Sequence, residues 1–244
     1  MIKTKNKRHL IGVFFGLGLL TALVPCSWAV IVSPIQLDLS VKNPIGSFTV
    51  TNDSAVTTTY QASSLTWTQV DGQDVQIITN DILVTPPIIS IKPKSSQVFR
   101  VALFKSSSHL EEKAYRVVLE DISVDVIEKT ETGLNFRFNH NLPLFFEPSS
   151  IVDSVSWSLC ESHIDGKSCL LMENKGNRRI KVVKFTALSA SAEESNSLSK
   201  TLLAGSSNQW IFSTKQGAEN TTSIKLITGK GPVTLNLKDL PMSR

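Results

Sequence analysis

The stretch from 133 to 148 reads GLNFRFNHNLPLFFEP and decides the fold class. In its first half Leu134, Phe136 and Phe138 alternate with polar residues, so in an extended chain they share one face. From 142 to 146 the residues are apolar almost throughout, which is typical of a strand buried on both faces. We therefore expect one long β-strand with an amphipathic first half and a buried second half.

The same period-two alternation extends to both sides of this stretch. Runs rich in Val, Ile, Thr and Phe are separated by turn residues about every ten positions, which is the signature of antiparallel β-sandwiches. No long amphipathic helix is evident, and the polar stretch 190–200 is expected to be a loop or a helical turn. The other expected strands are 30–39, 45–52, 57–69, 82–85, 88–92, 96–104, 113–126, 155–160, 169–173, 180–189, 208–213, 222–227 and 233–237.

The chain length indicates two domains. A chain of 244 residues exceeds one small sandwich and fits two all-β domains of about 100 residues each. The best boundary is the segment Glu147-Pro148-Ser149-Ser150, where the long apolar run ends and the proline disfavours a helical backbone at the residue before it. We therefore expect one domain at 30–148 and a second at 149–244.

The first 29 residues have the anatomy of a cleavable signal peptide. A basic segment precedes the apolar run 10–24, and the small-residue pattern Ser27-Trp28-Ala29 follows it. Cleavage is expected after Ala29, which places the mature protein in an exported compartment. Two alternatives stay open: a transmembrane anchor, although a span needs about 20 apolar residues, and a lipoprotein through Cys26, although Pro25 directly before it is unfavourable.

The basic charge of the whole chain belongs to this leader. Of the 25 basic residues, four lie in 1–29, which holds no acidic residue, so 21 remain to balance the 21 acidic residues. The mature chain is formally neutral. Its composition therefore predicts neither nucleic acid nor an anionic membrane surface as a partner.

The cysteines indicate a disulfide. Cys26 leaves with the leader, and Cys160 and Cys169 remain. An even pair in an exported protein predicts a disulfide, which would fasten a surface hairpin here. The alternative is a zinc site, but such a site needs four ligands and the only histidine nearby is His163.

Three segments resemble, in order and spacing, the first domain of PapD-like periplasmic pilus chaperones. They are 83–100 (LVTPPIISIKPKSSQVFR), 115–122 (YRVVLEDI) and 142–148 (LPLFFEP). The second domain resembles the family more weakly, through 174–177 (NKGN) with the strand after it and through the Gly-Pro-Val at 231–233. The residue pattern of these segments, with Tyr-Arg in one strand and Leu-Pro-Leu-Phe-Phe in the next, is similar to that of the archaic or alternative chaperone–usher branch.

The resemblance implies two immunoglobulin-like β-sandwiches in an L-shaped arrangement and a binding function. Such chaperones lend a strand to pilus subunits that lack one, by donor-strand complementation, and deliver them to an outer-membrane usher. Carried over to this chain, the donor side chains are Leu134, Phe136 and Phe138. Arg100 resembles the family's internal arginine, and Glu112 is its expected structural partner. Self-association of the free chaperone is left undecided.

One departure from the family concerns the subunit's terminal carboxylate. The well-known branch anchors it with two basic residues, but the corresponding positions here are Gln36 and Pro143. Charge-assisted hydrogen bonds are the strong ones, so we expect another cation to take this role. Arg116 is the first candidate, Arg137 the second and His140 the third; alternatively, the two arginines are solvated charges on a strand face.

Other functions have less support. The histidines lie in no metal-ligand spacing, and there is no nucleophile elbow, phosphate-binding loop or His-Glu-x-x-His motif. We therefore expect no enzymatic activity, metal or cofactor. The main alternative is an exported structural or adhesive β-sandwich such as a pilus subunit, in which 134–138 would face the domain's own core. A pilus subunit, however, is usually a single incomplete domain.

Overall fold

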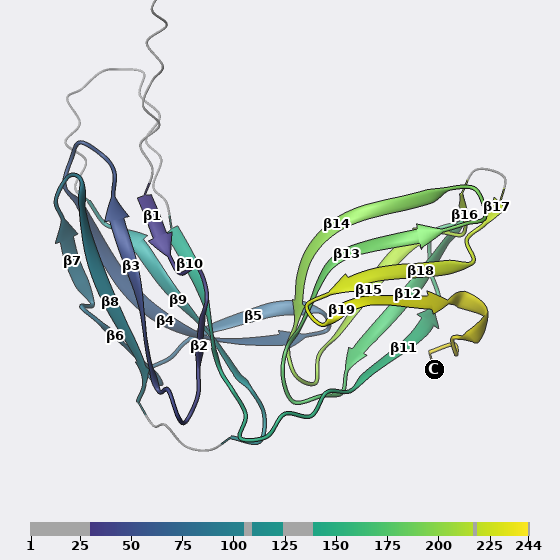
Figure 1. The fold of residues 1–244 in the computed structure, drawn as a ribbon, viewed down its shortest axis with the longest axis horizontal. Coiled ribbons are helices and arrows are strands. Elements are labelled where there is room, and N and C mark those ends of the chain that lie inside the picture. Colours follow the sequence, from purple (N-terminus) through teal and green to yellow (C-terminus); the bar gives the residue numbers. More distant parts are fainter. Residues whose placement is uncertain (1–29, 105–108, 124–138, 217–218, 244) are drawn as a thin grey trace, which may run out of the picture.

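The structure is a computed structural model that describes residues 30–104, 109–123, 139–216 and 219–243. The described chain is all-β, as predicted, with one short 3₁₀ helix at Leu237–Asp239. Figure 1 shows the strands gathered into two bodies, β1 to β10 and β11 to β19. The expected leader 1–29, the donor residues Leu134, Phe136 and Phe138, and Arg137 lie outside the described residues.

The first body is a sandwich of two sheets. One has the strand order β1-β3-β8-β6, and the other has the order β2-β10-β9-β4-β5, with β7 also paired to β4. Its strands are β1 (Val30–Ser33), β2 (Leu37–Leu39), β3 (Ile45–Asn52), β4 (Thr58–Val70), β5 (Gln73–Ile78), β6 (Ile82–Thr85), β7 (Ile88–Ile91), β8 (Ser95–Leu103), β9 (Lys113–Asp121) and β10 (Asn139–Phe146).

The second body contains the remaining strands. Its sheets have the orders β11-β12-β15 and β14-β13-β18-β19, and β16 pairs only with β17 among the described strands. The strands are β11 (Val155–Cys160), β12 (Lys167–Asn174), β13 (Ile180–Leu188), β14 (Glu193–Leu202), β15 (Ser207–Ser213), β16 (Lys215–Gln216), β17 (Glu219–Asn220), β18 (Ser223–Thr228) and β19 (Gly231–Asn236).

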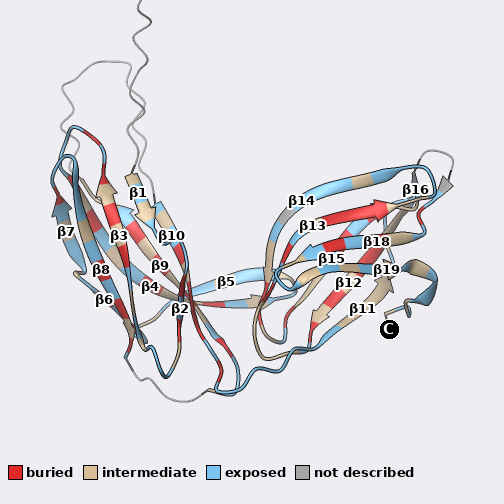
Figure 2. Cartoon of the chain, in the orientation of Figure 1, coloured by how far each residue is buried: buried red, intermediate tan, exposed pale blue. Residues whose placement is uncertain are grey.

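Alternating apolar residues build the core of each body. In β9 the buried residues are Tyr115, Val117 and Leu119, and the residues between them face the other side of the sheet. The rings of Phe48 and Phe99 stack across β3 and β8 with centroids 5.1 Å apart. Figure 2 shows buried residues on the strands of both bodies. Burial of these alternating side chains is the main force that fixes strand register.

The predicted disulfide is present. Cys160 and Cys169 are directly opposite each other in the β11–β12 hairpin, and their sulfur atoms are bonded. The bond lies at the end of the hairpin, so it fixes the spacing of the two strands there.

The structure departs from the strand predictions in three main places. The expected strand 30–39 is split into β1 and β2, which pair with different sheets; Pro34 separates them and has no backbone N–H to continue a ladder. The stretch 190–200 was expected to be a loop or helical turn, but β14 occupies most of it as an edge strand paired to β13. The strand β5 was not predicted, because Gln and Asp interrupt its apolar pattern.

The two bodies contain the same asparagine-centred turn. Asn52 and Asn174 are both fully buried. Each side-chain amide donates to the carbonyl oxygen four residues later, at Val56 or Arg178, and to a backbone carbonyl of a more distant segment. Each side-chain oxygen accepts from the backbone N–H two residues later. Both turns therefore satisfy buried backbone groups where a strand ends.

We expect Asn174→Ala to lower the free energy of unfolding of the second body by about 2–3 kcal/mol, because buried backbone groups would lose their partners. Urea unfolding followed by tryptophan fluorescence measures this change. The matched control is Asn236→Ala, since Asn236 is exposed and its amide bonds only to the nearby Asp239 among its described contacts. A loss equal to that of the control would contradict a structural role for the turn.

Candidate functional site

Among the described strands, one edge of β10 has no partner immediately after the predicted donor segment. On one side β10 pairs with β9 over its whole length, from Asn139 to Phe146. On the other side it pairs in parallel with β2 only at 144–146. Within the described part of the chain, no strand pairs with 139–143 on that second side. This edge is therefore open to strand addition.

The second half of β10 is buried on both faces, as predicted. Leu144 and Phe146 belong to the core of the first body, whereas Phe145 points to the opposite face of the sheet. There it packs with Trp67 of β4 and with Leu203 of the second body. The Trp67 and Phe145 ring centroids are 5.7 Å apart. An apolar cluster on this face thus joins the two bodies.

Arg116 lies on this same face and stacks on the tryptophan. Its guanidinium carbon is 3.7 Å from the centroid of the Trp67 ring, a geometry that favours a cation–π contact. In the strand register Arg116 is directly opposite Pro143 of β10 and Leu65 of β4. The structure therefore places the first candidate cation beside the position at which the resemblance expected a basic residue.

The guanidinium of Arg116 is half-buried and incompletely bonded. Its Nε is buried and has no hydrogen-bond partner among the described residues. Burial lowers the pKa of Arg116, and the negative charge of Asp74 partly opposes this shift. An arginine remains charged in spite of such a shift. The site therefore offers a positive charge with an unused donor.

His140, the third candidate cation, lies on the other face of the sheet. It is opposite the buried Leu119, so its side chain shares the core-facing side of β10 with Leu142. Burial lowers the pKa of His140, which favours the neutral ring near pH 7. His140 is therefore poorly suited to bind a carboxylate as a cation.

The expected ion pair of Arg100 with Glu112 is wrong. Arg100 is an exposed residue of β8, opposite Ser47 of β3. The Glu112 carboxylate instead pairs with Arg179 of the second body and also accepts a hydrogen bond from the Arg179 backbone N–H, 2.9 Å away. The sequence resemblance identified the buried acid but assigned it the wrong partner, because the true partner lies 67 positions away in the other body.

Arg179 connects several elements at the junction of the two bodies. Its guanidinium also pairs with Asp38 of β2, and its carbon lies 3.7 Å from the centroid of the Phe145 ring. The Glu112 side chain is only 2% exposed, whereas that of Arg179 is 23% exposed. Burial raises the pKa of Glu112, and the charge of Arg179 opposes this rise. The junction thus contains a buried acid that depends on a cation from the other body.

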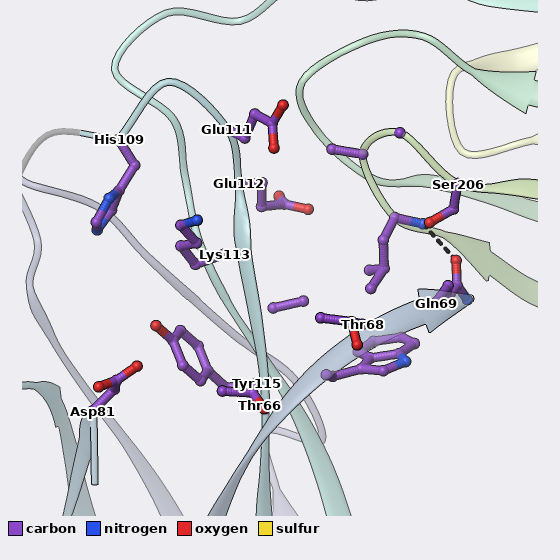
Figure 3. Close-up of a pocket in the computed structure, with 15 residues that line it drawn as sticks. Thr66, Thr68, Gln69, Asp81, His109, Glu111, Glu112, Lys113, Tyr115 and Ser206 are labelled. Atoms are coloured by element: carbon purple, nitrogen blue, oxygen red, sulfur yellow. Dashed lines mark hydrogen bonds between the residues drawn. The ribbon is translucent and has the colours of Figure 1, made fainter. Parts of the chain in front are cut away.

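A cleft of about 530 Å³ lies beside this cluster. Figure 3 shows side chains of the 109–115 segment, such as Glu112 and Tyr115, on one side and Gln69 with Ser206 on the other. A smaller pocket of about 250 Å³ is lined by Gln36, by the acidic residues Glu112 and Glu147, and by four cations of the second body. These cations are Arg178, Arg179, Lys181 and Lys230.

The described residues offer no metal or membrane-spanning site. Within the described ranges, no group of three or more His, Cys, Asp or Glu is placed to hold a metal ion. The described part of the chain also includes no helix that is long and apolar enough to cross a membrane.

Sequence comparison matches the first body. Residues 29–152 match the family model of pili and flagellar-assembly chaperones, PapD N-terminal domain. A search of curated protein sequences found no match.

Structural comparison finds the same fold in solved chaperones. The complex of the chaperone CsuC with the tip adhesion subunit CsuE, from archaic Csu pili of Acinetobacter baumannii, matches with a TM-score of 0.66 and 14% identity, over 88% of this chain and 100% of that one. The YadV chaperone matches with a TM-score of 0.61 and 12% identity, over 85% and 99%. The SafA pilin–SafB chaperone complex of Salmonella enterica matches with a TM-score of 0.58 and 14% identity, over 86% and 97%.

Proposed function

Since the chain belongs to the family of pili and flagellar-assembly chaperones defined by the PapD N-terminal domain, we propose that it is a periplasmic chaperone of pilus subunits. It captures a subunit by lending it a β-strand and delivers it to an outer-membrane usher. The observation that carries this proposal is the open edge of β10 at 139–143, directly after the alternating segment 134–138.

Capture proceeds by strand pairing and side-chain insertion. The subunit strand bonds to the free backbone groups of the β10 edge, while Leu134, Phe136 and Phe138 fill the groove left by the missing subunit strand. Each large apolar side chain that becomes fully buried contributes about 1.5–3 kcal/mol. Release follows when the extension of the next subunit replaces the donor strand, so the chaperone needs no ATP and catalyses no reaction.

The chain is organised for this task in three parts. Residues 1–29 are a cleaved signal peptide that directs export to the periplasm, 30–148 are the domain that carries the donor strand, and 149–244 are the second domain. This division is supported by the strand pairing, because among the described strands no ladder joins the 30–146 part to the 155–236 part.

Arg116 anchors the terminal carboxylate of the subunit. It is next to Pro143 at the open edge and has an unbonded buried Nε, so a carboxylate could supply the missing hydrogen bond. Phe145 lies on the same face of the sheet as Arg116, where it packs with Trp67 and with Leu203 of the second body. His140 is disfavoured because its side chain points into the core.

We expect Arg116→Met to weaken subunit capture about 10–100-fold, since a charge-assisted hydrogen bond is worth about 1.5–3 kcal/mol. Methionine keeps a long apolar side chain over Trp67, so the fold should persist. The measurement is competition for the subunit between variant and wild-type chaperone, with the complexes counted by native mass spectrometry. The same variant should show no deficit toward a subunit extended by two glycines, whose carboxylate is displaced; an equal deficit there would exclude Arg116 as the anchor.

The function itself is tested by coexpression in a periplasm with the pilin-like proteins encoded beside the gene. A stable one-to-one complex in the intact mass supports the chaperone. The second candidate is an exported structural sandwich such as a pilus subunit, and it predicts a polymer of the chain itself. A polymer, or a monomer that captures no subunit, would contradict the chaperone function.

A further inference from the structure

The two bodies are bonded to each other beside the linker that joins them. The chain passes between the bodies once, at 147–154. Next to this linker the start of β9 contacts the second body, where Glu112 pairs with Arg179. The backbone N–H of Glu112 also donates to the carbonyl oxygen of Asn177, and the amide of Asn177 donates to the carbonyl oxygen of Leu110, both at 2.8 Å. Contacts at this one place would still permit rotation of one body against the other.

A second contact is made by the end of the hairpin that β4 and β5 form. Among the described strands, β4 pairs with β9 only up to Thr66, whereas it pairs with β5 from Leu65 to Val70. The hairpin therefore projects beyond the sheet, and Figure 1 shows β5 reaching toward the second body. A two-stranded hairpin is at best marginally stable by itself in water, so this projection depends on the element that it contacts.

Gln69 uses its whole side-chain amide at this contact. The nitrogen donates to the carbonyl oxygen of Thr201 in the second body and to the carboxylate of Asp74 on β5, both at 2.8 Å. The oxygen accepts from the backbone N–H of Leu203 at 2.9 Å, a bond that is drawn in Figure 3. Asp74 thus fixes the amide within the hairpin, and the other two bonds hold the second body.

The contact includes a second polar bond and an apolar part. The ammonium of Lys200 on β14 donates to the carbonyl oxygen of Gly72, in the turn between β4 and β5, at 3.0 Å. The side chain of Leu203 packs with Trp67, and the guanidinium of Arg116 stacks on that same ring. A displacement of the hairpin from the second body would therefore reach the proposed anchor through Leu203 and Trp67.

We propose that the β4–β5 hairpin is a brace that fixes the angle between the two bodies, and that Gln69 is the positioning residue of this brace for subunit capture. The brace and the contact at Glu112 lie on different sides of the cleft, so together they prevent a rotation that either alone permits. A chain that is already ordered does not lose this freedom on binding, which raises its affinity. The role in capture rests on the proposed function, whereas the brace is a property of the free chain.

The brace is tested on the free chaperone with Gln69→Met, which keeps a long side chain but removes the amide. Nitroxide labels are placed on Ser47→Cys and Thr234→Cys, at exposed positions of β3 and β19. Pulsed electron paramagnetic resonance then measures the distance between the two bodies. We expect Gln69→Met to broaden the distance distribution relative to the same labels in the wild type, because the second body can then rotate about its remaining contact.

Two further variants complete this test. In Gln97→Met the lost amide bonds only to the carbonyl oxygen of the adjacent Val98 among its described contacts, so the distribution should keep its wild-type width. Lys200→Met removes a separate bond of the brace and should also broaden the distribution, which decides the question even where Gln69→Met fails to fold. Wild-type width in both Gln69→Met and Lys200→Met, or equal broadening in Gln97→Met, would overturn the brace.

The role in capture is measured with the pilin encoded beside the gene, by competition between each variant and differently tagged wild-type chaperone. We expect Gln69→Met to bind the pilin about three- to tenfold more weakly, as the loss of one or two hydrogen bonds implies, and Gln97→Met to match wild type. Unchanged affinity together with a broadened free chain would overturn the positioning role and support the brace. If the wild type captures no pilin, the proposed function and the positioning role fail together, while the distances in the free chain still decide the brace.

Discussion

Replacing Phe136 and Phe138 together by serine is expected to lower the affinity for a pilus subunit by at least about 100-fold. Two large apolar side chains, each worth about 1.5–3 kcal/mol when fully buried, would no longer fill the subunit groove. The corresponding loss of about 3–6 kcal/mol is a factor of about 10² to 10⁴ in the dissociation constant. The yield of one-to-one complex after periplasmic coexpression and affinity purification measures the effect.

The matched control is Phe104→Ser. Phe104 is 73% exposed and directly follows β8, a strand of the sheet that does not contain β10. Its replacement should leave capture unchanged, and circular dichroism should show that both variants are folded. If the Phe136 and Phe138 double variant still protected its subunit, 134–138 would not be the donor segment.

The second large effect is expected at Arg179. In Arg179→Met the buried Glu112 loses its cation, and we expect the free energy of unfolding to fall by about 3 kcal/mol, as is typical when one partner of a buried ion pair is removed. The cation also pairs with Asp38 and stacks on Phe145, so the contact between the two bodies should loosen as well. Urea unfolding monitored for each body, together with small-angle scattering, measures both changes.

The loss of unfolding free energy in Arg179→Met should depend on pH. Burial already raises the pKa of Glu112 and Arg179 opposes the rise, so the pKa must rise further in the variant. A carboxyl whose pKa is higher in the folded than in the unfolded state makes the fold less stable as pH increases above its ordinary pKa of about 4.3. The deficit of Arg179→Met should therefore be smallest near pH 4 and grow toward pH 7.

Arg178→Met is the control for Arg179. Arg178 is the adjacent arginine, and its pair with Asp153 is more exposed, at 34% and 42% of the two side chains. Such a pair contributes at most about 1 kcal/mol. If the loss of unfolding free energy in Arg179→Met did not change with pH, or if Arg178→Met lost as much, Arg179 would not be the cation that stabilises the buried carboxylate of Glu112.

The sequence was sufficient for features that depend on local pattern. Alternation of buried and exposed residues predicted the all-β class and most strands, with 45–52 and 155–160 matching β3 and β11 in full. The apolar run 142–146 predicted a strand buried on both faces. An even cysteine pair predicted the disulfide between Cys160 and Cys169. Each of these follows from the side-chain period of a strand or from the chemistry of neighbouring residues.

Strands with little burial were harder to predict. The edge strand β14 is mostly polar, and β5 has a mixed pattern, because both are held by backbone ladders and by contacts with neighbouring elements rather than by an alternating apolar face. The contact between β4 and the second body was equally hidden, since it depends on Gln69 meeting Thr201 and Leu203 in space.

By itself the sequence determined the all-β class and the strand at 142–146 that is buried on both faces, and it predicts an exported protein with an alternating donor segment at 134–138. Only the tertiary structure decided which charges meet. It paired Glu112 with Arg179 rather than Arg100, placed Arg116 on Trp67 beside Pro143, and turned His140 into the core. The reason is physical: side-chain period is a local property of a strand, whereas ion pairs and stacked rings depend on strand order and on the contact between two bodies far apart in sequence.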